Sequence, residues 1–282
     1  MKTFAGIPES FAQKERSAIW LQSIPYDGTS TWGKGADKGF EAFMNAASNM
    51  ELYDIETESE VYKYGIHLLD APPPFASPED MFSYTYHHTK SLLTKNKFLT
   101  FFGGEHSISI GIIKAFYEHF KDISILQIDA HADLRPTYEG TPYNHACALY
   151  DASQNSHLLQ VGIRSMDIEE KKHIQKGNMF YAHLLKGNDW ISDIVDRLKK
   201  NVYITFDLDA LDPSIMPATG TPEPGGLRWY EALDLLRSVF ASRNVLGFDI
   251  VELAPIDGLH GPQFLAAKLY YKMLSYKYYN HE

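Results

Sequence analysis

Short apolar segments alternate along the chain with longer segments whose apolar residues recur every three or four positions. The short segments predict strands at residues 18–24, 64–69, 98–102, 123–128, 158–163, 179–182, 202–206 and 245–251. The longer segments predict amphipathic helices at residues 108–120, 190–199 and 229–240. Because strands that alternate with helices build a parallel sheet covered on both faces, we expect an α/β fold.

The same pattern argues for one folding unit. No internal repeat, low-complexity tract or long linker divides the sequence, so we expect a single domain over residues 1–282. The segment PPPFASPED at residues 72–80 predicts a loop leading into a helix, with Ser77 as its N-cap. In the tyrosine-rich tail, residues 269–279, the apolar spacing predicts packing or a subunit contact.

Ionisable residues alternate directly after two of the predicted strands. Asp129, His131 and Asp133 follow the fourth strand, and Asp207 and Asp209 follow the seventh. Alternate residues of an extended chain lie on one face, so each set is expected to share a face if the strand geometry continues. The carboxyl ends of parallel strands are where open α/β sheets build their sites. Carboxylates brought together there repel one another unless a cation lies between them.

A third strand end contributes a histidine. The glycine turn GGEHS follows the strand at residues 98–102 and presents His106 at the start of the next helix. The candidate ligands are therefore His106, Asp129, His131, Asp133, Asp207 and Asp209. Oxygen and nitrogen ligands without thiolate favour Mn²⁺ over structural zinc, and four carboxylates balance two dications. One such cluster alone is more often a turn or cap, but three together predict a dinuclear metal site.

Composition narrows the partners and the compartment. The formal charge is -10, from 26 Lys and Arg against 36 Asp and Glu, which argues against nucleic acid and is compatible with a cationic ligand. The single cysteine, Cys147, has no partner for an intrachain disulfide. The first 20 residues contain no signal-peptide core, and no apolar run approaches the roughly 20 residues of a membrane span. We therefore expect a cytoplasmic protein with no membrane partner.

These motifs resemble those of a known enzyme family. GGEHS at residues 103–107, DAHAD at 129–133 and YITFDLDALDP at 203–213 are similar to signatures of the ureohydrolases, the arginase and agmatinase family of dimanganese enzymes. The resemblance continues in collinear order through residues 24–30, 162–165 and 218–226. It implies a three-layer α/β/α fold with a mainly parallel eight-stranded sheet. It also implies a homo-oligomer, a trimer or a hexamer.

The resemblance further implies how two Mn²⁺ ions per subunit are held. The first ion would be bound by His106, Asp129, Asp133 and Asp207. The second would be bound by His131, Asp129, Asp207 and Asp209. Asp129 and Asp207 would then bridge the two ions, and a hydroxide between them would attack the poorly electrophilic carbon of a guanidinium group.

Further site residues are carried over from the family in the same way. His145 matches a histidine suited to proton transfer, and Glu252 matches the carboxylate that pairs with the guanidinium and orients it. Asp133 counts as catalytic as well as a metal ligand. Glu252, His145 and Arg135 are the residues expected to contact the substrate. Without the resemblance, His145 would be a surface loop residue and Glu252 a cap or salt-bridge partner.

The loop after Asp133 bears on the choice of substrate. Arg135 stands where arginase-type enzymes have an asparagine that reads the amino-acid head group, which argues against arginine. The loop is similar to one branch of agmatinases, so the expected reaction converts agmatine and water into putrescine and urea. However, Arg135 should repel the ammonium group of agmatine unless Glu139 or another carboxylate neutralises it. 4-Guanidinobutyrate and aminopropylagmatine therefore stay open as substrates.

Two other readings lie outside guanidine hydrolysis. A metal-dependent amidase or deacetylase on the related fold would release a carboxylate instead of urea. A metal-binding regulator without catalysis would lack a ligand or His145. The presence of all six ligands, of Glu252 and of His145 argues against both.

Overall fold

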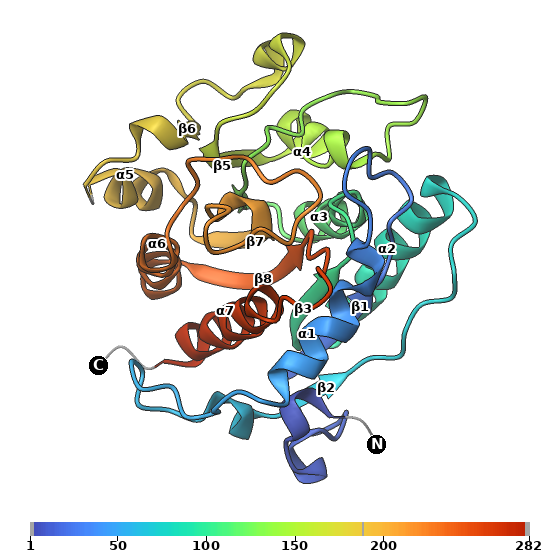
Figure 1. Ribbon diagram of the computed structural model, residues 1–282, viewed down its shortest axis with the longest axis vertical. Coiled ribbons are helices and arrows are strands. Elements are labelled where there is room, and N and C mark those ends of the chain that lie inside the picture. The colour runs from blue at the N-terminus through green and yellow to red at the C-terminus, as the bar shows by residue number, and fades with distance from the viewer. Residues whose placement is uncertain (1–2, 188, 280–282) are drawn as a thin grey trace.

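The computed structural model describes residues 3–187 and 189–279, which include one eight-stranded sheet in the order β2-β1-β3-β8-β7-β4-β5-β6 (Figure 1). Every pair of neighbouring strands is parallel. The strands are β1 (Ile19–Ile24), β2 (Ile66–Leu68), β3 (Phe98–Gly103), β4 (Ile123–Ile128), β5 (His157–Ile163), β6 (Met179–Tyr181), β7 (Asn201–Asp207) and β8 (Asn244–Val251).

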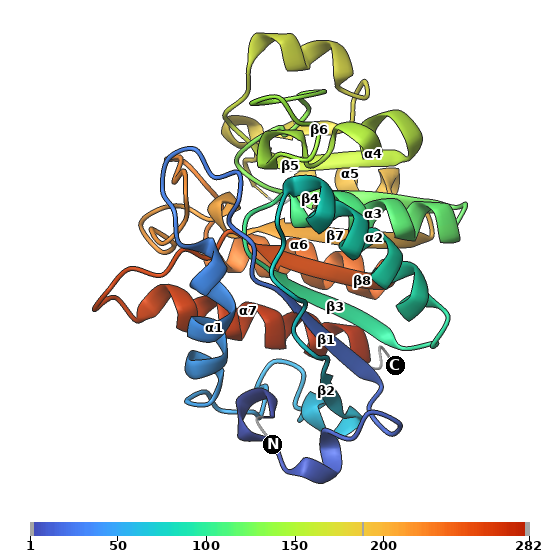
Figure 2. The same cartoon turned by 90° about the vertical axis from the view of Figure 1, so that its right-hand side faces the viewer.

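Helices cover both faces of this sheet, as Figures 1 and 2 show. One face carries α1 (Gly39–Ala47), α5 (Asp189–Arg197), α6 (Trp229–Ser242) and α7 (Gly261–Tyr278). The other face carries α2 (Pro78–Leu93), α3 (Ile108–His119) and α4 (Tyr150–Asn155). The expected three-layer α/β/α architecture is therefore confirmed, with a sheet that is entirely parallel.

Two hydrophobic cores, one on each face, explain the apolar strands. Successive residues of β3 alternate between them: Phe102 stacks on Phe43 of α1, with ring centroids 4.1 Å apart, whereas Phe101 lies in the opposite core. In that opposite core Phe116 of α3 packs against Tyr203 of β7 at 4.3 Å. A strand buried on both faces needs apolar residues at nearly every position, so it appears in the sequence as a continuous apolar run.

The predicted elements correspond closely to those observed. All eight predicted strands are present with similar boundaries. The helix after PPPFASPED is α2, and the Ser77 side chain caps it by accepting a hydrogen bond from the Asp80 backbone N–H at 3.1 Å. The tyrosine-rich tail belongs to α7 and is largely buried, with Tyr270 fully enclosed. The short helices α1 and α4 were not predicted.

Loops at the carboxyl edge of the sheet are tied to one another. In Figure 2 the loops that follow β1, β7 and β8 lie at the same edge. The Gly33 N–H donates to the Gly220 carbonyl at 3.1 Å, which joins the first two loops. The GGEHS turn fits against the first loop only because residue 104 is glycine: a Cβ there would lie 1.8 Å from the Tyr26 carbonyl oxygen. The edge that should carry the site is therefore closely packed.

Among the helices formed by residues 3–187 and 189–279, none is both long enough and apolar enough to cross a bilayer.

Candidate active site

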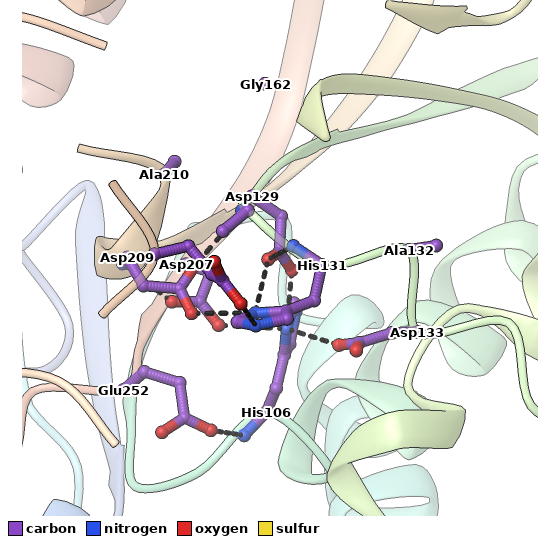
Figure 3. A network of polar contacts seen from close by, with 12 residues as sticks. His106, Asp129, His131, Ala132, Asp133, Gly162, Asp207, Asp209, Ala210 and Glu252 are labelled. Atoms are coloured by element: carbon purple, nitrogen blue, oxygen red, sulfur yellow. Dashed lines mark hydrogen bonds and ion pairs between the residues drawn. The ribbon is translucent and has the colours of Figure 1, made fainter. Parts of the chain in front are cut away.

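Four neighbouring strands at the centre of the sheet deliver the candidate site residues. Their order is β3-β8-β7-β4, so the segments that follow them are adjacent in space. Figure 3 shows the side chains that they bring together, which are His106 after β3, Glu252 after β8, Asp207 and Asp209 from β7 and the turn beyond it, and Asp129, His131 and Asp133 after β4. The side chains of the three predicted motifs therefore converge, as expected.

A first cluster of potential ligands surrounds Nδ1 of the fully buried His106. The three carboxylate oxygens are Oδ2 of Asp129 at 3.1 Å, Oδ2 of Asp133 at 3.1 Å and Oδ2 of Asp207 at 3.3 Å. Among the described residues, none forms a hydrogen bond with Nδ1. A buried nitrogen facing three carboxylates in this way is an arrangement suited to a cation.

The opposite ring nitrogen of His106 is fixed by a buried relay. Nε2 lies 2.9 Å from Oγ1 of Thr205, whose hydroxyl donates to Asp249 at 2.7 Å. Tyr203 donates to the other oxygen of Asp249, also at 2.7 Å. Because the threonine hydrogen is used on the carboxylate, the hydroxyl accepts the N–H at Nε2 of His106. The lone pair on Nδ1 is thereby left for a metal ion.

A second cluster shares Asp129 with the first. Nδ1 of His131 lies 2.9 Å from Oδ2 of Asp209 and 3.7 Å from Oδ1 of Asp129. The potential ligands therefore form two groups, and within each group the ligand atoms lie within 4.8 Å of one another. The groups are His106 with Asp129 and Asp133, and Asp129 with His131 and Asp209. The residues present therefore fit two neighbouring divalent ions with Asp129 between them. Asp207 approaches the first group through His106.

The electrostatics of the cluster show how strongly it requires positive charge. Burial acts to lower the pKa of His106, but the carboxylates of Asp129, Asp133 and Asp207 outweigh it and raise that pKa well above the usual range. Burial, together with the Asp129 carboxylate, raises the pKa of Asp133 to about 7. Protons thus provide the balancing charge that divalent ions would otherwise supply.

The expectation that these residues alternate along continuing strands is wrong in detail. β4 ends at Ile128, and Asp133 has a left-handed backbone with φ of 52°. Asp209 lies in a 3₁₀ turn, Leu208–Ala210, and the Asp207 side chain caps this turn by accepting the Asp209 backbone N–H at 2.8 Å. On continuing strands the side chains would point in parallel directions and stay apart. The irregular turns after the strands redirect them, and the side chains converge for this reason.

A cavity of about 310 Å³ is lined by Glu252 and by all the candidate ligands except the fully buried Asp129. Oε1 of Glu252 accepts the backbone N–H of His106 at 2.7 Å, which fixes the carboxylate beside the first cluster. Its backbone is also left-handed, with φ of 68°, a conformation that costs a non-glycine residue on the order of 1–3 kcal/mol. Burial and the neighbouring Glu105 carboxylate raise the pKa of Glu252 well above its usual range.

His145 and Arg135 reach the same cavity from the segment after Asp133. His145 is half-buried, and burial lowers its pKa to about 4, so the ring is neutral near pH 7. Nη2 of Arg135 lies 3.3 Å from Oδ2 of Asp167, and its guanidinium lies over the Tyr138 ring at 4.6 Å. The neutralising carboxylate is therefore that of Asp167, whereas Glu139 is exposed.

Several supporting residues were not found from the sequence. The side chain of Arg164 donates to the backbone carbonyls of Asp209 and Glu223, both at 2.7 Å, and so ties the loop at residues 218–226 to the turn that carries Asp209. Gln127 donates to Oδ2 of Asp129 at 2.6 Å. Arg164 lies in a segment that carries the family resemblance, and Gln127 lies in a predicted strand. Their hydrogen bonds, however, leave no periodic signal in the sequence.

The lone cysteine does not contribute to the cluster. Cys147 is buried, and burial raises the pKa of its thiol to about 12. A thiol that stays protonated at neutral pH is a poor nucleophile and a poor metal ligand. This favours the oxygen and nitrogen ligand set over cysteine chemistry.

Comparisons with known proteins agree along nearly the whole chain. The model of the "Arginase family" matches residues 17–275. N(1)-aminopropylagmatine ureohydrolase from Synechocystis is 33% identical over 291 residues, covering 97% of this chain and 95% of that protein. Agmatinase from Bacillus subtilis is 31% identical over 251 residues, covering 86% of this chain and 85% of that protein.

A solved structure gives the same result. The agmatine ureohydrolase of Thermoplasma volcanium aligns with a TM-score of 0.88 and 28% identity, over 98% of this chain and 94% of that one. Fold, motifs and sequence similarity thus coincide over the residues that carry the clusters. The protein belongs to the arginase family.

Proposed function

We propose that the protein is an agmatinase-type ureohydrolase, which converts agmatine and water into putrescine and urea. Its family and relatives make it a hydrolase of C–N bonds in guanidino compounds. The observation that carries the proposal is the pair of candidate ligand clusters that share Asp129, beside a cavity that their other members line together with Glu252.

The proposed metal ligands are His106, Asp129, His131, Asp133, Asp207 and Asp209. We propose two Mn²⁺ ions per subunit because the donors are oxygen and nitrogen, with no thiolate among them. When bound, two divalent ions supply the acidity that makes water nucleophilic at neutral pH.

Glu252 is proposed to bind and orient the guanidinium group. Its carboxylate is held by the His106 N–H and lies in a setting where burial disfavours the charged form. A guanidinium cation removes that penalty by forming charge-assisted hydrogen bonds to the carboxylate oxygens. The binding energy then fixes the orientation of the guanidinium carbon relative to both ligand clusters.

His145 is proposed to move the proton that the reaction requires. Its ring is neutral at pH 7, so it can accept a proton released from water and pass it to the departing amine nitrogen. Asp133, which lines the same cavity, is proposed as a second proton-transferring group. The atoms balance, because the C–N bond is broken, urea leaves, and the amine receives the proton that water lost.

A cationic substrate tail is compatible with the cavity because Asp167 neutralises Arg135. Aminopropylagmatine is a second candidate. Relatives bearing that name are 32–35% identical, compared with 31–32% for the agmatinases. In addition, Oε1 of Glu223 lies 4.0 Å from Nε2 of the cavity-lining His131, where a further carboxylate favours a longer, more positive substrate.

The test is urea release by the purified, Mn²⁺-loaded protein. The substrates are agmatine, aminopropylagmatine, 4-guanidinobutyrate and arginine, with Glu252→Gln as the inactive control. Urea from agmatine at the highest kcat/KM supports the proposal, and preference for aminopropylagmatine selects the second candidate. Absence of urea from all four, with release of acetate from an acetylated amine, would contradict ureohydrolase activity and favour an amidase.

We also propose a homo-oligomer in the cytoplasm, acting in polyamine biosynthesis. A groove of about 1110 Å³ beside α6 and α7 is lined by several exposed apolar side chains, among them Tyr53, Ile55, Tyr230 and Phe264. Apolar groups gathered in this way are typical of subunit contacts. The compartment is inferred from the single cysteine, which has no disulfide partner in the sequence.

A further inference from the structure

Thr29 connects a buried carboxylate to His145. Its hydroxyl donates to Oε1 of Glu105 at 2.8 Å. Oγ1 of Thr29 in turn accepts the backbone N–H of His145 at 3.0 Å and lies 3.2 Å from Nδ1 of the His145 ring. Thr29 and Glu105 are both buried, and Glu105 is fully enclosed. One hydroxyl therefore contacts both the backbone and the ring of the histidine.

The contacts of Glu105 determine where the threonine hydrogen lies. Oε1 also accepts the Thr29 N–H at 3.2 Å and the Ser107 hydroxyl at 2.8 Å, and Oε2 accepts the Ser107 N–H at 2.7 Å. All these partners act as donors, so the carboxylate acts only as an acceptor. The hydrogen of Thr29 is consequently directed at Glu105, and the lone pairs of its oxygen face His145.

This hydrogen-bond arrangement selects one form of the neutral ring. A hydroxyl oxygen that has already donated its hydrogen can contact Nδ1 favourably only if Nδ1 carries a hydrogen. Nε2 then keeps the lone pair, and it is the nitrogen available for proton transfer. In the opposite tautomer, two lone pairs would face each other across 3.2 Å in a partly buried position.

We propose that Thr29, oriented by Glu105, is a positioning residue that holds His145 in its Nδ1–H tautomer. This rests on the proposed function, in which His145 moves the proton. Thr29 touches neither the substrate nor the ligand clusters in this role. It acts through the ring that it orients.

The variants must separate this role from a purely structural one. Glu105 is unsuitable because its carboxylate also accepts the backbone N–H and the hydroxyl of Ser107, and so holds the GGEHS turn. Thr29→Val removes the hydroxyl at nearly constant volume, and Thr29→Ser restores it. Thr89→Val is the matched control, because Thr89 is buried in α2 and its hydroxyl bonds to no described residue.

The kinetic experiment uses the Mn²⁺-loaded enzyme and measures metal content, kcat and KM for urea release. We expect Thr29→Val to keep its metal and its KM while kcat falls roughly 10- to 100-fold, as for other partners that fix a histidine tautomer. Thr29→Ser should recover most of kcat, and Thr89→Val should match the wild type. In His145→Ala, adding Thr29→Val should cost little more, because the two residues act as one unit.

A second readout does not depend on activity. In ¹⁵N-labelled protein loaded with diamagnetic Mg²⁺, the ring nitrogens of His145 are identified from the signals missing in His145→Ala. We expect the Nδ1–H pattern in the wild type and in Thr29→Ser, and a shift toward Nε2–H in Thr29→Val. An unchanged tautomer, an unchanged kcat, or a kcat that falls only with the metal content would overturn the proposal.

The two proposals fail in different ways. A wild type that releases no urea from any guanidino substrate overturns the proposed function, while the tautomer spectra still decide whether Thr29 controls the ring. A wild type that releases urea, with a Thr29→Val variant equal to Thr89→Val in rate and spectrum, overturns the positioning role alone.

Discussion

Nε2 of His106 and Oγ1 of Thr205 lie 2.9 Å apart, and this contact decides which nitrogen of the ring faces the carboxylates. The hydroxyl of Thr205 donates to Asp249 and accepts from the histidine. His145 has the same kind of support from Thr29 and Glu105. Two histidines of one cavity are thus each oriented by a threonine that a buried carboxylate holds.

Removing the hydroxyl of Thr205 should weaken metal binding while the fold survives. For Thr205→Val we expect the affinity for Mn²⁺ to fall roughly 10- to 100-fold, because His106 loses the partner that fixes its tautomer. Titration calorimetry of the metal-free protein measures this. Thr100→Val is the control, since Thr100 is equally buried but contacts Trp20 and Tyr270. Equal affinities in the two variants would remove Thr205 from metal binding.

Asp129 is the carboxylate common to both clusters, so its loss should affect both proposed ions. We expect Asp129→Asn to lower the metal content of the purified protein and to reduce urea release more than the roughly 10- to 100-fold typical of an outer-shell partner. Circular dichroism should show an intact fold. Asp122→Asn, a change at an exposed position, should behave as the wild type. Normal metal content in Asp129→Asn would refute the bridging assignment.

Metal binding should release protons near neutral pH. For His131, as for His106, burial acts to lower the pKa, but nearby carboxylates raise it, here those of Asp209 and Asp129. Metal ions must displace these protons, so we expect release of about one to two per chain and an affinity that falls as the pH falls. Calorimetry in buffers of different ionisation enthalpy measures the number. Identical heats of binding in all buffers would contradict the predicted proton release.

The stability of the metal-free protein should fall as the pH rises, whereas its affinity for metal ions should increase. Histidines whose folded-state pKa is raised contribute stability that is fully present below their unfolded pKa of about 6.5 and declines as the pH rises above it. Chelation should therefore lower Tm most on the alkaline side, and this is measurable by calorimetric scans at a series of pH values.

Asp167 should favour a cationic substrate by neutralising Arg135. Asp167→Asn keeps an acceptor for the Glu169 N–H but removes the charge, so the KM for agmatine should rise a few-fold. The effect is small because the pair is partly exposed, where such pairs contribute about 0.2–1 kcal/mol. Asp193→Asn makes the same charge change on the exposed side of α5. If both variants have the same KM, Arg135 lies outside the reach of the substrate tail.

The groove beside α6 and α7 should be a subunit contact. Ile55 is 84% exposed there, and Ile55→Asp should shift the protein toward smaller assemblies in light scattering coupled to size exclusion. Leu184→Asp, at a position 64% exposed but outside this groove, is the control. A wild type that is already monomeric would contradict the proposed oligomer. Equal assembly of both variants would place the contact elsewhere.

Much of the fold followed from the sequence because the strands are buried on both faces. Each strand is an apolar run between polar turns, and α3 has a long periodic pattern. The six residues of α4 are too few to establish such a periodicity. For α1, Gly35 shortly before the helix and Gly39 at its first position resemble a turn more than a helix start. That one domain spans residues 1–282 stays a prediction.

The candidate ligands followed from the sequence because each motif is contiguous, whereas their support did not. Asp129 and Asp133 belong to one five-residue segment. Thr29 lies 76 positions from Glu105 and 116 from His145, and no spacing rule connects them. The left-handed backbone of Asp133 was also missed, since aspartate adopts this backbone more often than most residues but still in only a small minority of cases.

The position of β8 in the sheet has a consequence for biosynthesis. It is the last strand made, and it lies between β3 and β7. Until it emerges from the ribosome, the nascent chain can build only two separate half-sheets, β2-β1-β3 and β7-β4-β5-β6. His106 belongs to one half and the aspartates to the other. Translation must therefore pass residue 251 before the sheet closes, and in a chain truncated earlier the candidate ligands of the two halves would never meet.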